Sequence, residues 1–367
     1  MLEKILSLPL EQKIGQLFFI GLAGHEVDET ARYLLKEISP GGVCLFARNI
    51  REAGQTRRLL DDICKDSTLA PFLSLDQEGG LVDRLRRIVE PMPAVNLLKT
   101  TDQVKTLAEI TAETVRILGF NMNFAPVVDV INKTRTKFVN GLYSRTFGQS
   151  KEEVFEFSNV YLETLQKNGV LGSIKHFPGL GATEVDSHEE LPCVNFKNEE
   201  FKSIDLYPYK EFFKAPEVHA VMIGHAAFPN LDLQERDRNG KLLPSSLSFN
   251  FTTKLLREHL GFDGLALTDD LEMGAILKNY GIGEACKMAI KAGQDLLLIC
   301  NDSNAIREGF YAVLEAVNLG EIAESRINNS LQRIAVVKNL IKSPLDFDKN
   351  RLDELSKEIA DLKEQLN

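Results

Sequence analysis

The chain alternates between short, continuous apolar runs and longer stretches in which apolar residues recur with helical spacing. The apolar runs number eight: Leu17–Leu22, Val43–Ala47, Phe72–Asp76, Met122–Val130, Gly172–His176, Ala220–His225, Gly264–Asp269 and Asp295–Cys300. Continuous apolar runs suit strands that are buried on both faces, as parallel strands are. Between them, Gln103–Leu118 and Lys151–Asn168 repeat apolar residues with the helical period. This alternation predicts an α/β fold, a (β/α)8 TIM-type barrel with a C-terminal helical extension.

An open, doubly wound sheet is the alternative fold. It calls for a glycine-rich phosphate turn after the first strand, and "GLAGHE" beyond the first run does not have the G-x-G-x-x-G spacing. We therefore expect residues 1–342 to form one catalytic barrel. Residues 343–367 are expected to form a helical tail, whose apolar stripe packs either on the barrel or on a partner: Leu352, Leu355, Ile359, Leu362 and Leu366.

Composition narrows the class of protein further. The 367 residues are 44% hydrophobic, which is ample for a large core, and the net charge is −10. Lysines and arginines form no continuous stripe, so a nucleic-acid partner is not expected. No apolar segment reaches the roughly 18–20 residues of a membrane helix. The five cysteines are dispersed without CxxC spacing, which indicates reduced thiols and predicts a cytoplasmic protein. We also expect a monomer or weak dimer.

Charged and polar residues stand where the predicted strands end. They close runs three to seven: Asp76, Gln77, Glu78, Asp129, Lys175, His176, His225, Asp269 and Asp270. In a (β/α)8 barrel the active site forms at the carboxyl ends of the strands. A single such residue would be an ordinary structural group, whereas a ring of convergent charge indicates an enzyme's active site.

Three chemistries could use this ring. Metal-dependent hydrolysis in a barrel would want His-x-His after the first strand, and "LFFIGL" has no histidine. Phosphate-ester chemistry would want a glycine-rich anion site near the last strands; "LLLICNDSNA" has none, although Asp302 or Ser303 could cap a helix there. Cleavage of a glycosidic bond needs a carboxylate near the anomeric carbon and an acid for the leaving oxygen. Asp269 suits the first role, and we expect no metal or cofactor.

The second role draws attention to "KHFPGLGATEVDSH", residues 175–188. Asp186 and His188 can face the same way on this Gly/Pro-containing loop, and a histidine paired with a carboxylate can donate a proton and then take one back. Alternatively, Asp186 is a helix N-cap, because Glu189 follows at capping-box spacing. The spacing alone leaves both readings open.

Six motifs together resemble glycoside hydrolase family 3, and within it the single-domain β-N-acetylglucosaminidases of bacterial cell-wall recycling. The motifs are "DQEGG" at Asp76–Gly80, "NFAPVVDV" at Asn123–Val130, "SRTFG" at Ser144–Gly148, "KHFPG" at Lys175–Gly179, "DSH" at Asp186–His188 and "TDDLEM" at Thr268–Met273. The resemblance covers most of the chain, from "EQKIGQLFFIG" to about Asn301.

The resemblance implies a retaining exo-β-N-acetylglucosaminidase that acts on small carbohydrates, either disaccharides containing N-acetylglucosamine or muropeptides. Asp269 would be the nucleophile, and His188, oriented by Asp186, the acid/base. Asp270 is set aside because adjacent strand residues point to opposite sides. Glucosidases of the family take their acid/base from a second domain, for which this chain leaves no room, so we expect the proton donor within the barrel. The implied sugar-binding residues are Asp76, Arg84, Arg145, Lys175 and His176.

Two positions depart from the family pattern. Leu81 stands where the family usually has arginine, and Leu180 where it usually has histidine. Neither change removes a proposed catalytic group, but both bear on the substrate. His225 is expected to support the site rather than touch the sugar. The alternatives are a β-N-acetylglucosaminide phosphorylase that uses the same site and a non-catalytic sugar-binding homologue.

Overall fold

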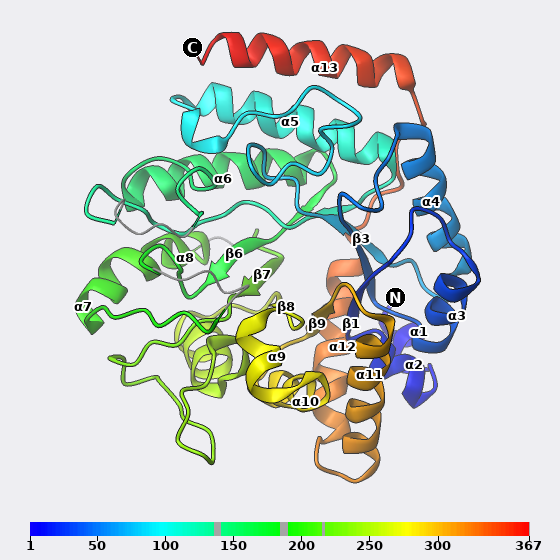
Figure 1. The fold of residues 1–367 in the computed structure, drawn as a ribbon, viewed down its shortest axis with the longest axis vertical. Helices are drawn as coiled ribbons and strands as arrows, with labels where there is room; N and C mark the ends of the chain where they lie inside the picture. Colours follow the sequence, from blue (N-terminus) through cyan, green and yellow to red (C-terminus); the bar gives the residue numbers. More distant parts are fainter. Residues whose placement is uncertain (136–140, 184–189, 215–216, 367) are drawn as a thin grey trace.

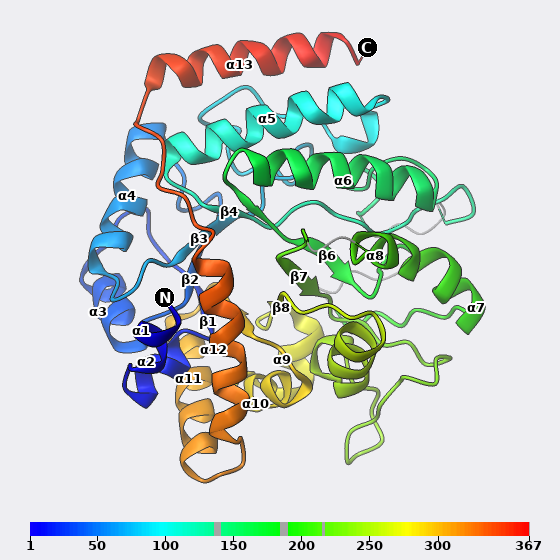
Figure 2. The same ribbon diagram turned by 180° about the vertical axis from the view of Figure 1, so that it is seen from behind.

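In the computed structural model, a ring of parallel strands is surrounded by helices (Figures 1 and 2). The structure describes residues 1–135, 141–183, 190–214 and 217–366. The strands are β1 (Phe18–Gly21), β2 (Gly42–Leu45), β3 (Phe72–Leu75), β4 (Met122–Asn123), β5 (Leu171–Gly172), β6 (Ile174–Phe177), β7 (Ala220–Ile223), β8 (Leu265–Asp270) and β9 (Leu296–Ile299). Their order in the sheet is β5-β4-β3-β2-β1-β9-β8-β7-β6, and every pairing is parallel.

The nine strands found among the described residues come from the eight predicted runs, because β5 and β6 are two parts of one run. Only Ser173 separates them, and its N–H donates to the carbonyls of Asn123 and Ala125, both at 3.1 Å. Lys175 N–H donates to the carbonyl of Pro126 at 3.2 Å. These bonds bring the two ends of the sheet together, so the prediction of a (β/α)8 barrel is confirmed and the open sheet is wrong.

Helical segments on the outer side of the barrel follow every strand except β5, which continues directly into β6. The longer helices are α3 (Glu29–Ile38), α4 (Ala53–Asp66), α5 (Thr101–Leu118), α6 (Lys151–Lys167), α8 (Leu206–Phe212), α10 (Ile282–Ala292), α11 (Ser303–Asn318), α12 (Glu324–Lys338) and α13 (Lys349–Glu364). The wider helical segment η4 (Asn250–His259) makes the crossover between β7 and β8. Shorter elements are α1 (Leu2–Leu6), α2 (Leu10–Gly15), η1 (Val95–Leu97), α7 (Asn198–Glu200), η2 (Phe201–Asp205), η3 (Ser245–Leu247) and α9 (Gly274–Tyr280).

Local sequence signals explain where several of these helices begin and end. The side chains of Thr100 and Ser150 accept N–H bonds from Gln103 and Glu153, which caps α5 and α6. Helix α5 ends at Gly119, whose φ of 105° suits glycine. Asp302 caps α11 by accepting the N–H of Asn304, as the sequence allowed.

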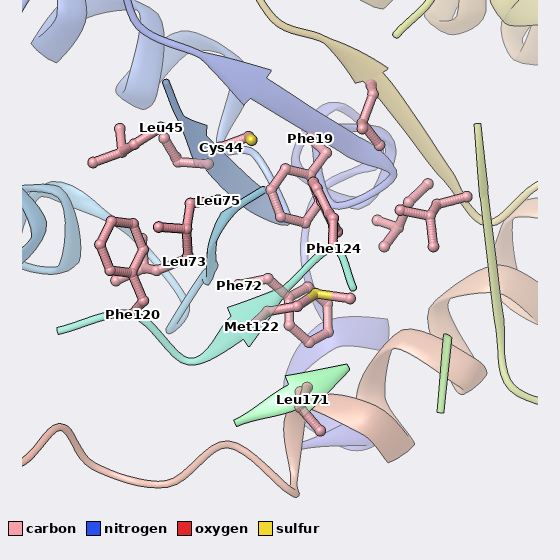
Figure 3. Close-up of a cluster of buried hydrophobic side chains, with 14 of the residues drawn as sticks. Phe19, Cys44, Leu45, Phe72, Leu73, Leu75, Phe120, Met122, Phe124 and Leu171 are labelled. Carbon is pink, nitrogen blue, oxygen red and sulfur yellow. The ribbon is translucent and has the colours of Figure 1, made fainter. Parts of the chain in front are cut away.

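Aromatic rings fill the barrel beneath its carboxyl-terminal mouth. Figure 3 shows Phe19, Phe72, Met122 and Phe124 gathered between the strands. The Phe19 ring lies 5.2 Å from the Phe124 ring and 6.4 Å from the Phe72 ring. Gly42 on β2 leaves space for Phe19, since an added Cβ would lie 2.5 Å from that ring. The interior is therefore a packed core and not a pore.

The C-terminal helix α13 lies against α5 at one side of the barrel (Figure 1). Its apolar stripe is buried: Leu352, Leu355, Ile359 and Leu362. Arg351 makes two hydrogen bonds with Glu113 of α5, at 2.7 and 2.8 Å. Among the described residues, no helix is long and apolar enough to span a lipid bilayer.

Candidate active site

A cavity of about 200 Å³ opens among the carboxyl ends of the strands. Ionisable side chains from the segment after β3, from β6, from the end of β8 and from the loop before α6 line it: Asp76, Glu78, Arg84, Arg145, Lys175, His176, Asp269 and Asp270. The rest of its lining is largely apolar: Cys44, Phe46, Val82, Phe124, Leu142, Leu180, Pro192, Met222, Met273, Leu298 and Cys300, with Thr183. All five predicted sugar-binding residues and the predicted nucleophile therefore share one cavity.

One side of the cavity is a buried network of alternating charge. Lys175 Nζ lies 2.6 Å from Asp76 Oδ1 and 2.7 Å from Glu78 Oε1. Arg145 donates two hydrogen bonds to Glu78, at 2.7 and 2.9 Å. Arg84 lies farther away, with 3.7 Å between its Nη2 and Asp76 Oδ2. The bidentate pair fixes the planes of both side chains, so the charged wall has a defined shape.

The network also controls protonation. Burial acts to raise the pKa of Glu78, but the cations of Arg145 and Lys175 hold that pKa well below its usual range. Burial acts to lower the pKa of Lys175, and the carboxylates of Asp76 and Glu78 reverse this and raise it. Both groups therefore stay charged at neutral pH, each because of the other.

The turn after β3 requires its two glycines. Gly79 and Gly80 have φ of 93° and 58°, and a Cβ on Gly79 would lie 2.3 Å from the carbonyl oxygen of Pro93. Gln77, just before the turn, accepts the backbone N–H of Arg84 at 2.9 Å. The "DQEGG" motif thus folds the chain back so that Glu78 and Arg84 both line the cavity.

The opposite side is formed by the end of β8, where both aspartates line the cavity. The expectation that only one of them could face the mouth is wrong. The β8–β9 register shifts between Leu267 and Asp270, and Leu298 N–H donates to the side-chain hydroxyl of Thr268 at 3.0 Å. This irregularity interrupts the alternation of a regular strand. The β6–β7 register shifts in the same way around Lys175 and His176, which also line the cavity together and are joined by a cis peptide bond.

The two aspartates differ in protonation. Burial acts to raise the pKa of Asp269, but the electrostatic influence of the neighbouring His225 and His176 outweighs it and lowers that pKa, helped by the N–H of Asp270 at 2.8 Å. Burial raises the pKa of Asp270 to about 7, and the negative charge of Glu272 adds to the effect. Asp269 is therefore the ionised carboxylate of the pair at neutral pH.

His225 does not line the cavity, in line with a supporting position. Its Nε2 lies 3.0 Å from the backbone oxygen of Asp270, and its Nδ1 lies 2.7 Å from Ser246 Oγ. It therefore contacts the backbone at the end of β8, where the two aspartates lie.

The acid/base pair predicted from the sequence, Asp186 and His188, lies outside the described residues, as does Glu189. Two further charged residues of the site were noted at strand ends but not predicted as site residues. Glu78 pairs with both Lys175 and Arg145, and Asp129 Oδ2 lies 2.7 Å from His176 Nδ1. Their positions inside "DQEGG" and "NFAPVVDV" were the available signals. In the described part of the chain, no three His, Cys, Asp or Glu side chains are grouped to hold a metal ion.

The two departures from the family pattern have different environments. Leu81 is 69% exposed on the turn after Gly80. Leu180 is 5% exposed, lines the cavity and belongs to an apolar cluster with Phe177 and Ile223. Only Leu180 can therefore contact a ligand bound in the cavity.

Comparison with known proteins assigns the family. The model of the "Glycosyl hydrolase family 3 N terminal domain" matches residues 9–337. A β-hexosaminidase of Tolumonas auensis is 30% identical over 303 residues, which are 81% of this chain and 85% of the relative. A solved family 3 β-N-acetylglucosaminidase from Paenibacillus sp. str. FPU-7 is 33% identical with a TM-score of 0.85, over 97% of this chain and 69% of that one.

A second solved structure, a family 3 glycosyl hydrolase from Mycobacterium smegmatis, has a TM-score of 0.80 and 30% identity, over 91% of this chain and 98% of that one. The match of the family model over most of the chain and the agreement of the whole barrel with these structures lead to the same conclusion. The chain belongs to glycosyl hydrolase family 3.

Proposed function

We propose that the protein is a retaining exo-β-N-acetylglucosaminidase that removes terminal N-acetylglucosamine from small glycosides, with peptidoglycan-derived muropeptides as the natural substrates. The observation that carries the proposal is the ionised Asp269 in a cavity whose other side is a fixed wall of charge. The relatives named β-hexosaminidase and β-N-acetylglucosaminidase support the choice of sugar.

The dimensions of the cavity favour exo action. Its volume of about 200 Å³ is below the roughly 300–1,000 Å³ of pockets that bury drug-sized ligands. A cavity of this size suits a single sugar ring. The ring's hydroxyls would bind the side chains that line the cavity as hydrogen-bond donors and acceptors: Asp76, Lys175, His176, Arg84 and Arg145.

In the proposed mechanism the Asp269 carboxylate attacks the anomeric carbon while the bond to the leaving oxygen breaks. His188, held by Asp186, gives its proton to that oxygen. The product of this step is a glycosyl ester on Asp269. Water then attacks the same carbon, His188 takes the water's proton, and the Asp269 carboxylate is released. No metal or cofactor has a step in this scheme.

The function is tested with 4-nitrophenyl N-acetyl-β-glucosaminide beside the plain β-glucoside, each with and without phosphate. Release from the N-acetyl substrate alone, as free sugar, is expected. A sugar 1-phosphate product would identify the protein as a phosphorylase. Release from neither substrate by folded protein would support a sugar-binding protein without catalysis.

A further inference from the structure

Asp129 is a buried carboxylate next to the cavity for which the proposed mechanism has no role. It lies in the chain segment that follows β4, and its side chain is 0% exposed. Its Oδ2 lies 2.7 Å from His176 Nδ1, and its Oδ1 accepts the backbone N–H of Leu180 at 2.6 Å. One carboxylate therefore holds two groups that both line the cavity.

The first contact sets the hydrogen on the His176 ring. A carboxylate can only accept, so the His176 Nδ1 must carry the proton that is donated to Asp129. Nε2 is then the ring nitrogen that remains for a ligand in the cavity. A histidine fixed in this way keeps one tautomer and one ring orientation.

The second contact fixes the start of the turn that follows β6. Leu180 N–H is bound to Asp129, and the carbonyl of Leu180 accepts the N–H and the hydroxyl of Thr183, at 3.1 and 2.9 Å. The Leu180 side chain is packed in the apolar cluster, so the turn is held on both its polar and its apolar sides. Residues Asp186 and His188 follow this turn in the sequence.

We propose that Asp129 is a positioning residue that joins the sugar-binding His176 to the turn leading to the acid/base pair. One carboxylate then sets the tautomer of His176 and also fixes the position of the turn at Leu180, after which the chain continues toward Asp186 and His188. The role of His188 in this proposal rests on the proposed function, whereas the tautomer of His176 does not.

Asp205 provides a matched control. It is a buried carboxylate in the same region, since a Cβ added to Gly179 would lie 2.8 Å from the Cβ of Asp205. It binds Arg135 through two hydrogen bonds, at 2.7 and 2.9 Å, and it does not line the cavity. Asp205→Asn therefore removes a buried charge close by without touching His176 or Leu180.

The test compares Asp129→Asn with Asp205→Asn. The asparagine keeps an oxygen for Leu180 N–H but turns an NH₂ donor toward His176, whose Nδ1 must then become an acceptor. Nitrogen-15 NMR of labelled histidine should show His176 Nδ1 protonated in the wild type and in Asp205→Asn, and unprotonated in Asp129→Asn. kcat/KM should fall by more than about tenfold in Asp129→Asn, because a wrong imidazole tautomer impairs a histidine site. An unchanged tautomer, or an equal loss of kcat/KM in both variants, would overturn the first half of the proposal.

Asp129→Ala tests the second half, because it also removes the acceptor of Leu180 N–H. The ratio of Asp129→Ala activity to Asp129→Asn activity should be lower on a methyl glycoside than on the 4-nitrophenyl glycoside, because the methyl glycoside needs an acid to protonate its leaving group. Equal ratios on both substrates would refute the link to the acid/base pair. Absence of hydrolysis by the wild type would refute the proposed function but leave the NMR result standing.

Discussion

The two sides of the cavity hold their carboxylates in opposite ways. Just after β3, Asp76 and Glu78 are paired with Lys175 of β6 and with Arg145 of the loop before α6, at 2.6 to 2.9 Å. At the end of β8, Asp269 accepts the N–H of its neighbour and, among the described residues, has no cation within 4.0 Å. Paired charges keep a binding wall in one shape, whereas a carboxylate that must attack carbon has to be ionised and available. This difference is what the proposed function requires, with sugar-binding groups on one side and the reacting group on the other.

The largest expected effect comes from the β8 side. Asp269→Ala should lower kcat by at least about 10³-fold, because removing a nucleophile removes the covalent step itself. Asp270→Asn should retain most activity, since its amide keeps the shape of the side chain. Steady-state kinetics on the 4-nitrophenyl substrate measure both. If Asp270→Asn were the more damaged variant, the roles of the two residues would have to be exchanged.

On the paired side the main expected effect is on stability. Lys175→Met leaves Asp76 and Glu78 close together without their shared cation, and should lower the free energy of unfolding by about 3–5 kcal/mol. Lys363→Met breaks a 2.6 Å pair with Glu90 whose side chains are more than a third exposed, and should cost at most about 1 kcal/mol. Urea unfolding distinguishes them. Similar losses in both variants would mean that the network contributes no more than a surface pair.

The two sides should also respond to pH with opposite sign. Glu78 has a lowered pKa, so its stabilising effect is present above its unfolded value of 4.5 and is lost as the pH falls below it. Asp270 has a raised pKa, so its protonated form stabilises the protein at low pH, and this effect is lost as the pH rises from 3.8 to about 7. Thermal unfolding measured across pH tests both effects. Glu78→Gln should weaken the loss of stability at acid pH, and Asp270→Asn should weaken the loss of stability as the pH rises to about 7. An unchanged pH dependence of stability in both variants would contradict these assignments.

The smallest expected effects come from restoring the family pattern. Leu180→His places an imidazole in an apolar cluster beside the cavity, and should lower stability by about 1–3 kcal/mol and change KM. Leu81→Arg, on an exposed turn, should change stability by less than about 0.5 kcal/mol. Thermal unfolding and KM for the N-acetyl substrate measure both. If Leu81→Arg changed KM and Leu180→His did not, the substrate would contact the turn after β3 and not Leu180.

The barrel could be predicted because its signal is local: buried parallel strands must be apolar along their whole length, as in Leu296–Ile299. The predicted run Met122–Val130 forms a strand only over Met122–Asn123, because its later residues bond residues of the following strand segment irregularly, as Val128 N–H does with the carbonyl of Lys175. Boundaries of this kind depend on contacts that the run itself does not contain.

The members of the site could be predicted from strand ends and motifs, but their directions could not. A register shift decides that Asp270 lines the cavity beside Asp269, and such a shift depends on how Leu298 of the neighbouring strand bonds Thr268. Asp129 was passed over for a related reason. The positioning role that we propose for it depends on two partners 47 and 51 residues away in the sequence, which the closed barrel brings to it.

Trapping of the covalent intermediate tests the central claim most directly. A 5-fluoro analogue of N-acetylglucosaminyl fluoride slows breakdown of the glycosyl-enzyme, and peptide mass spectrometry then locates the sugar. The account predicts one sugar per chain, attached to Asp269, and none in Asp269→Ala. A sugar on Asp270, or hydrolysis of the N-acetyl substrate with inversion at the anomeric carbon, would contradict it.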